Sequence, residues 1–238
     1  YPSDLGGNPY KYIPYDTATV AEAFRDAGYD TAAIVSNVWL KASMGFDQGF
    51  EHYDEKSAIS EFYADGDRVE WKTAADVTDA ALAWLASERQ APFFLWLHYL
   101  DPHHPYDPPA QYRDLFSPAT QEHGDFLAKL RGMTTGEQTR ALTKIGTGET
   151  AIADSEFQAI IDQYDGEIAY TDAQIGRVID RLAELGAATN TMIVITADHG
   201  EEFRDHGAWG HSHTLHRELI RVPLIIAPPG TAAARRVP

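Results

Sequence analysis

Apolar and polar positions along this chain follow an order that predicts helices, each followed by a strand. Residues 17–28 place apolar side chains at helical spacing and end at Gly28, a residue suited to a helix C-terminus. The segment TAAIVS at 31–36 then predicts a buried strand. A second helix is expected over 73–89, and the apolar run FFLWLHY at 93–99 predicts the strand that follows it.

The second half of the chain repeats this order with a longer helix. Residues 155–186 carry apolar side chains spaced for one helical face. The segments TMIVIT at 191–196 and VPLIIA at 222–227 predict two further strands. Near-continuous apolar strands between amphipathic helices indicate an α/β fold, with a mainly parallel sheet sandwiched between helices.

One stretch of the chain does not follow this pattern. Residues 111–153 are polar and repeat glycine and threonine, so we expect an insert or lid with little strand content in one domain, or a large piece of one, spanning 1–238. The three glycines around Gly146 do not follow an apolar strand as a phosphate-binding loop would, and we expect them to form a flexible linker.

Composition narrows the possible partners and leaves the compartment open. The chain has 19 lysines and arginines against 36 aspartates and glutamates, a net charge of −17 that disfavours nucleic acid as a partner. Cysteine is absent, which excludes disulfides and thiolate sites within the chain. No apolar run approaches the ~20 residues of a membrane helix, so we expect a soluble chain that is periplasmic, extracellular or cytoplasmic. Its oligomeric state stays open.

Histidines and carboxylates concentrate directly after the predicted strand 191–196. Half of the ten histidines lie in the segment ADHGEEFRDHGAWGHSHTLH at 197–216. In open parallel sheets, ligands gather beyond the carboxyl ends of the strands. A carboxylate beside an imidazole there is a usual ligand set for a divalent cation, so Asp198 and His199 are the first metal candidates. The alternative is a polar loop whose histidines face water.

A second polar segment, LDPHHPYDPP, follows the strand predicted at 93–99. It contains His103 and His104 between prolines that restrict the backbone, as suits a preorganised site, although a proline-rich turn fits equally well. His98 lies within the apolar run and is interpreted as a core histidine. The chain has no G-x-S-x-G, Walker or H-E-x-x-H motif, which leaves a serine triad without support.

Several of these segments together resemble the sulfatase family of the alkaline phosphatase superfamily. They are FFLWLHYLDPHHPYDPP, YDGEIAYTDAQIGRVIDRL and ITADHGEEFRDHGAWGHSHTLHRELIRVPLII, in the family's order, with TVAEAFRDAGYDTAAIVSN and GFDQGFEHYD upstream. The resemblance covers most of the chain except 111–153. It implies an alkaline-phosphatase-like α/β core and the metal-dependent hydrolysis of sulfate esters.

The resemblance also implies roles for individual residues. Asp198 and His199 match the family's metal-binding D-H-G or D-N-G motif. His103 matches the histidine that contacts the sulfate or its leaving oxygen, and His211 matches a basic anion contact, so these two are the expected catalytic residues. Weaker expectations for substrate binding fall on His206, His213 and Asn37.

The resemblance implies a bound divalent cation, but the types of the ligand residues do not determine which ion it is. Calcium is the expected ion, with Mn²⁺, Zn²⁺ and Mg²⁺ as alternatives that the imidazole of His199 also accepts. The implied substrate is a small-molecule or saccharide sulfate ester. The same motifs leave open a phosphatase, a phosphonate hydrolase, a phosphoethanolamine transferase or a noncatalytic fragment.

The chain departs from the family pattern at the nucleophile. It contains neither a C-x-P-x-R nor an S-x-P-x-R motif, and it lacks the early pair of metal-binding aspartates. The opening YPSDLGGN resembles the segment after the nucleophile helix, and the closing APPGTAAARRVP resembles the middle of the family's fold. We therefore expect a fragment truncated at both ends, inactive by itself, whose formylglycine would derive from an upstream cysteine.

Overall fold

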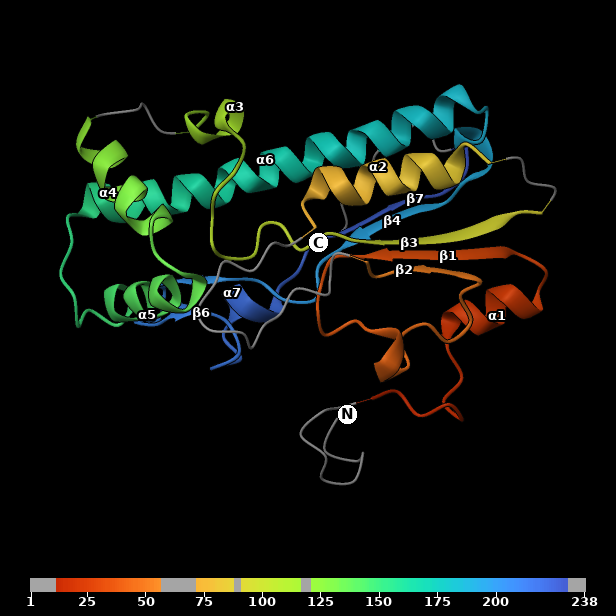
Figure 1. Cartoon of the computed structure of the whole chain (residues 1–238), viewed down its shortest axis with the longest axis horizontal. Helices are drawn as coiled ribbons and strands as arrows, with labels where there is room; N and C mark the ends of the chain where they lie inside the picture. Colours follow the sequence, from red (N-terminus) through yellow and green to blue (C-terminus); the bar gives the residue numbers. More distant parts are fainter. Residues whose placement is uncertain (1–11, 57–71, 88–90, 117–120, 231–238) are drawn as a thin grey trace. The chain divides into compact units, whose positions relative to one another are not determined.

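A computed structural model describes residues 12–56, 72–87, 91–116 and 121–230 of the chain (Figure 1). These residues fall into two compact units, 1–103 and 104–238, which are taken separately below. The opening segment 1–8 and the closing segment 231–238, both used in the resemblance, lie outside the described residues.

The first unit contains a parallel sheet whose central strand is buried at every residue except the first. Strand β1 (Asp30–Val35) lies between β2 (His52–Asp54) and β3 (Phe93–His98). Both neighbours pair with it in parallel, and Ala32 is opposite His52 on one side and Leu95 on the other. Consecutive side chains of a strand point to opposite faces, and four consecutive residues of β1 have no exposed surface, so both faces are covered.

Two helices cover this sheet, and their termini are specified locally. Helix α1 (Val20–Asp26) and helix α2 (Ala74–Leu85) each begin with a threonine capping box. Figure 1 shows them on opposite sides of the strands. Gly28 follows α1 with a φ of 83°, a conformation that a glycine adopts without strain, as the sequence predicted. A short 3₁₀ turn, η2 (Ala42–Met44), precedes β2.

The second unit is built along one long helix, α6 (Asp154–Glu184), which Figure 1 shows spanning the top of the view. The 3₁₀ turn η3 (Ala188–Asn190) leads into β4 (Ile193–Thr196), which pairs antiparallel with β7 (Leu224–Ala227). Between these two strands lie the hairpin of β5 (Glu202–Phe203) with β6 (Trp209–Gly210) and the short helix α7 (Arg217–Ile220). The predicted α/β fold with a parallel sheet and helices is confirmed, and two antiparallel pairs accompany it.

The polar stretch 111–153 is helical and contributes to the core of the second unit. It contains the C-terminal part of α3 (Ala110–Arg113) and all of α4 (Gln121–Arg131) and α5 (Thr135–Gly146). The core side chains form one cluster drawn from α4, α5, α6, the hairpin and the loop before α3: Tyr106, Leu130, Leu142, Ile160 and Trp209.

The prediction of a flexible linker around Gly146 is wrong. A Cβ added to Gly146 would lie 2.2 Å from Cβ of Trp209, so the end of α5 packs against β6 at a distance that only glycine permits. The sequence concealed this because the apolar residues of α4 and α5 are few and widely spaced among polar ones.

The two units differ in how well their strands are covered. Val194 of β4 and Leu224, Ile225 and Ile226 of β7 are each more than half exposed, although their sequences are as apolar as that of β1.

Among the described residues, no helix is both long and apolar enough to cross a membrane.

Candidate active site

The loop that follows β4 brings Asp198, His199 and Gly200 against α7. The backbone N–H of Gly200 donates to the carbonyl of Leu219 at 2.8 Å. A Cβ at Gly200 would lie 1.9 Å from the carbonyl oxygen of Glu218, so this approach requires glycine. The D-H-G sequence therefore has a structural as well as a chemical basis, because its glycine holds the loop to α7.

Asp198 and His199 present two potential metal-ligand atoms to solvent. Their Oδ1 and Nε2 atoms lie 3.9 Å apart, and their side chains are 80% and 40% exposed. Nδ1 of His199 lies 2.8 Å from the carbonyl oxygen of Gly200, an atom that can only accept, so Nδ1 donates and, in the neutral ring, the lone pair is on Nε2. A backbone carbonyl that fixes the tautomer in this way is typical of metal-binding histidines. This pair of ligand atoms, a carboxylate oxygen and an imidazole nitrogen, fits a divalent cation.

His211 lies beside this pair, directly after the end of β6. Its ring stacks on that of His199, with centroids 4.0 Å apart. Its Nδ1 lies 2.9 Å from Oε1 of Glu201, and Oε2 of Glu201 accepts a hydrogen bond from the hydroxyl of Tyr106 at 3.0 Å. The hydrogen bond to Glu201 outweighs burial and raises the pKa of His211 above its ordinary value of 6.5. The arrangement favours a charged imidazole, suited to contacting an anion.

His213 is held inside the loop by a fully buried carboxylate. Its Nε2 lies 2.9 Å from Oε2 of Glu202, and its Nδ1 lies 3.2 Å from the carbonyl oxygen of His211. Glu202 also accepts the backbone N–H groups of His206 and Ala208, at 3.0 and 2.8 Å. Burial alone would raise the pKa of Glu202, but these hydrogen bonds together lower it. Both ring nitrogens of His213 are thus engaged within the protein.

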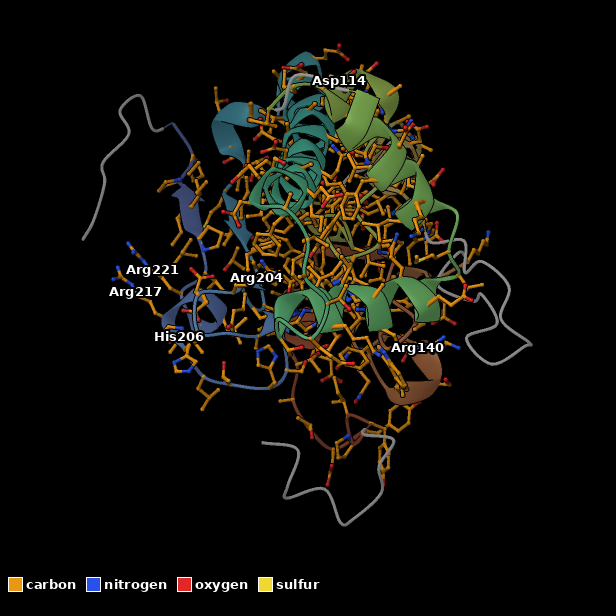
Figure 2. The ribbon with its side chains drawn as sticks, turned by 90° about the vertical axis from the view of Figure 1, so that its left-hand side faces the viewer. Asp114, Arg140, Arg204, His206, Arg217 and Arg221 are labelled. Carbon is orange, nitrogen blue, oxygen red and sulfur yellow. The ribbon has the colours of Figure 1, made fainter. Side chains whose placement is uncertain are left out.

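His206 forms a separate group with His216 and Glu218. Nδ1 of His206 lies 2.5 Å from Oε1 of Glu218, and the two imidazoles stack with centroids 3.7 Å apart and planes 7° from parallel. One ion cannot lie in the planes of two parallel stacked rings, so the group does not converge on a metal as it stands, although its ligand atoms lie within 4.8 Å of one another. Figure 2 shows Arg217 of α7 and Arg221, which follows α7, on the same side as His206.

The remaining predicted residues belong to the first unit. The side chain of Asn37 accepts the backbone N–H of Trp39 at 2.9 Å, and the backbone N–H of His103 donates to Leu100 at 2.9 Å. Nδ1 of His98, a partly buried side chain of β3, lies 3.3 Å from Oγ of Ser36. Because His103 and Asn37 lie in the first unit and Asp198, His199 and His211 in the second, their sharing one site stays a prediction.

Sequence reasoning did not single out the carboxylates that orient the histidines. Glu201 and Glu202 follow the D-H-G motif directly, ten and eleven residues before the histidines they contact. The sequence did contain a signal. Glu201 and Glu202 are adjacent, and the two histidines that they contact, His211 and His213, are separated by one residue. Tyr106 carried no such signal because it lies 95 residues from Glu201.

The fold and the site define an α/β protein with a solvent-exposed carboxylate and imidazole pair, beside a histidine suited to an anion. The sulfatase family model matches residues 1–238, so the chain belongs to the sulfatase family.

Individual relatives agree with this membership. An arylsulfatase of Clostridium perfringens is 30% identical over 142 residues, covering 58% of this chain and 28% of the relative. The multifunctional alkaline phosphatase superfamily protein PehA of Trinickia caryophylli is 30% identical over 173 residues, covering 68% of this chain and 33% of PehA. The chain thus spans about a third or less of these curated relatives.

Solved structures share the fold. A protein in complex with its substrate D-glucosamine-2-N,6-O-disulfate matches with a TM-score of 0.63 at 21% identity, over 96% of this chain and 59% of that one. A phosphonate monoester hydrolase from Silicibacter pomeroyi matches with a TM-score of 0.63 at 24% identity, over 92% and 54%. These similarities show that the chain shares the α/β fold of these structures.

Proposed function

We propose that a protein containing this chain is a metal-dependent sulfuric ester hydrolase, to which the chain contributes part of the metal and anion site. The observation that carries the proposal is the grouping of Asp198, His199 and His211. Two of these side chains offer lone pairs to a cation, and the third offers an N–H to an anion. Membership in the sulfatase family supports assigning that anion as a sulfate ester.

Asp198 and His199 would hold the cation. When bound, a divalent ion supplies Lewis acidity toward the non-bridging oxygens of the ester. The oxygen of Asp198 favours Ca²⁺, whereas the nitrogen of His199 also suits Mn²⁺, Zn²⁺ or Mg²⁺, so we propose Ca²⁺ with these as alternatives. The tautomer of His199 set by Gly200 is the contribution of this chain to that affinity.

His211 would donate its Nε2–H to the anion while Nδ1 stays with Glu201. Preorganised donors of this kind stabilise developing negative charge and are typically worth about 10²–10³-fold in turnover. His103 is proposed as a second donor, to the leaving oxygen. The nucleophile is proposed to be a formylglycine of a protein that contains this chain, a proposal that membership in the sulfatase family supports.

The proposed substrate is a small-molecule or saccharide sulfate ester. The solved protein in complex with its substrate D-glucosamine-2-N,6-O-disulfate shares this fold, and that similarity supports a saccharide substrate. Hydrolysis of a phosphonate or phosphate ester is the second candidate, because PehA is named as multifunctional and a phosphonate monoester hydrolase shares the fold.

The decisive experiment compares p-nitrophenyl sulfate with p-nitrophenyl phosphate and a phenyl phosphonate monoester, using a protein that contains this chain and its upstream nucleophile segment. We expect the sulfate ester to be hydrolysed with the highest kcat/KM. His211→Ala should lower kcat about 10²–10³-fold. The control His52→Ala, an exposed histidine of β2, should leave kcat unchanged. A preference for the phosphonate ester, or full activity of His211→Ala, would refute the proposal.

A further inference from the structure

We infer that Glu201, held by Tyr106, is a positioning residue that fixes the imidazole of His211 so that Nε2 is the nitrogen presented to the substrate. This inference rests on the proposed function and names a contribution that neither the motifs nor the family membership assigns. It is carried by the geometry of three side chains, all in the second unit.

The two oxygens of Glu201 have different partners. Oε1 lies 2.9 Å from Nδ1 of His211, and Oε2 lies 3.0 Å from the hydroxyl of Tyr106. The side chain of Glu201 is 6% exposed and that of His211 is 19% exposed. A carboxylate removed from water in this way is stable only where donors satisfy its oxygens. Because a carboxylate accepts, Nδ1 of His211 carries the proton in this pair.

Tyr106 connects this pair to the rigid core of the unit. Its ring is 6% exposed and packs against Tyr164, Phe203 and Trp209, with centroids 5.5, 6.1 and 6.0 Å away. A phenol held on that many sides cannot follow a moving carboxylate. The tyrosine therefore restricts Glu201, which in turn restricts His211.

The backbone beneath the pair is fixed as well. Glu202, the next residue, is fully buried and bound by three donors, which holds the start of β5 in place. Gly210, with a φ of 80°, ends β6 immediately before His211. The start of β5 is thus anchored, and the ring of His211 is held by its contact with Glu201 together with its stacking on His199.

The first test reads the tautomer of His211 by ¹⁵N NMR in the purified 238-residue chain. At about pH 9, above the ordinary histidine pKa of ~6.5, the wild-type ring should carry its proton on Nδ1. Glu201→Ala should return it to the tautomer mixture of a free histidine. Glu201→Gln keeps an acceptor for Nδ1 and a partner for Tyr106, so it should restore the wild-type signal.

Both variants remove the charge of Glu201, and only Glu201→Gln keeps a hydrogen-bond acceptor, so comparing them separates positioning from electrostatics. If Glu201→Gln behaves like Glu201→Ala, or if Glu201→Ala leaves the tautomer unchanged, the inference is overturned. A melting curve confirms that each variant is folded, and Tyr106→Phe provides a second variant that keeps the ring in the core. It should shift His211 in the same direction as Glu201→Ala, by less.

The second test measures kcat and KM in the longer protein. Removing a residue that orients a substrate-contacting group typically costs about 10–100-fold, so Glu201→Ala should lose this factor in kcat while Glu201→Gln recovers most of it. Tyr164→Phe is the matched control, because it removes a half-buried hydroxyl from the neighbouring ring without touching the Tyr106–Glu201 bond. It should retain wild-type kcat.

These two readouts also separate the inference from the proposed function. The tautomer is measured without turnover. If the NMR result is as expected but the protein hydrolyses no sulfate ester, only the proposed function is refuted. An unchanged kcat in Glu201→Ala of an active enzyme sinks the positioning role alone.

Discussion

Two carboxylate and histidine pairs in the same loop region differ in what surrounds them. The side chains of Asp198 and His199 are 80% and 40% exposed, with Oδ1 and Nε2 3.9 Å apart. Glu202 and His213 lie 2.9 Å apart, with the glutamate fully buried and bound by two further backbone donors. Residue types that look equivalent in sequence therefore do different work. A carboxylate with open lone pairs can take a cation, whereas one already saturated by donors stabilises the loop.

The largest expected effect separates the two pairs by stability. Glu202→Leu leaves three hydrogen-bond donors without their acceptor, and because hydrogen bonds to a charged group are worth about 1.5–3 kcal/mol each, we expect a loss of about 3 kcal/mol or more in the free energy of unfolding. Asp198→Ala, the exposed counterpart, should change it by less than about 0.5 kcal/mol when no cation is present. Urea unfolding of the chain measures both. Equal losses in the two variants would contradict the comparison.

The second prediction reverses the comparison by adding the cation. A ligand that binds only the folded state at 100 times its Kd stabilises it by about 2.7 kcal/mol, so Ca²⁺ or Mn²⁺ should raise the melting temperature of the chain. Asp198→Ala should abolish this rise. The control Asp205→Ala removes a nearby exposed carboxylate, which accepts the N–H of Phe203, and should keep the rise. An unchanged rise in Asp198→Ala would remove it from the metal site.

The smallest expected effect is a pH dependence of the structural pair. The pKa of Glu202 is lowered from 4.5, so its contribution is present above that value and is lost as the pH falls through the folded pKa. The pKa of His213 is raised from 6.5 chiefly by its hydrogen bond to Glu202, so its contribution is present below that value and is lost as the pH rises through the folded pKa.

The two windows overlap between pH 4.5 and 6.5, where the pair contributes most. The stability difference between wild type and His213→Ala should be largest there, at about 1 kcal/mol or less for a partly exposed pair, and should shrink on either side. Urea unfolding across this pH range tests it. A difference that grows steadily above pH 6.5 would show that another group is responsible.

Most of the fold was predictable because its elements are specified locally. The predicted strands 31–36 and 93–99 correspond to β1 and β3, and the helix predicted over 155–186 is α6, with bounds that differ by one or two residues. The stretch 111–153 was not predictable in the same way. Its few buried side chains, such as Leu130 and Leu142, gain their role only by packing against α6 and β6.

The candidate site divides along the same line. Adjacent residues such as Asp198 and His199 could be paired from the sequence, because backbone geometry keeps neighbours together whatever the rest of the chain does. Local periodicity likewise determined the helices, the strands and the α/β class. Which carboxylate is buried and which stays open was decided only by the tertiary structure. Burial of Glu201 and Glu202 depends on partners such as Tyr106, which reach them only when residues far apart in sequence pack into one core.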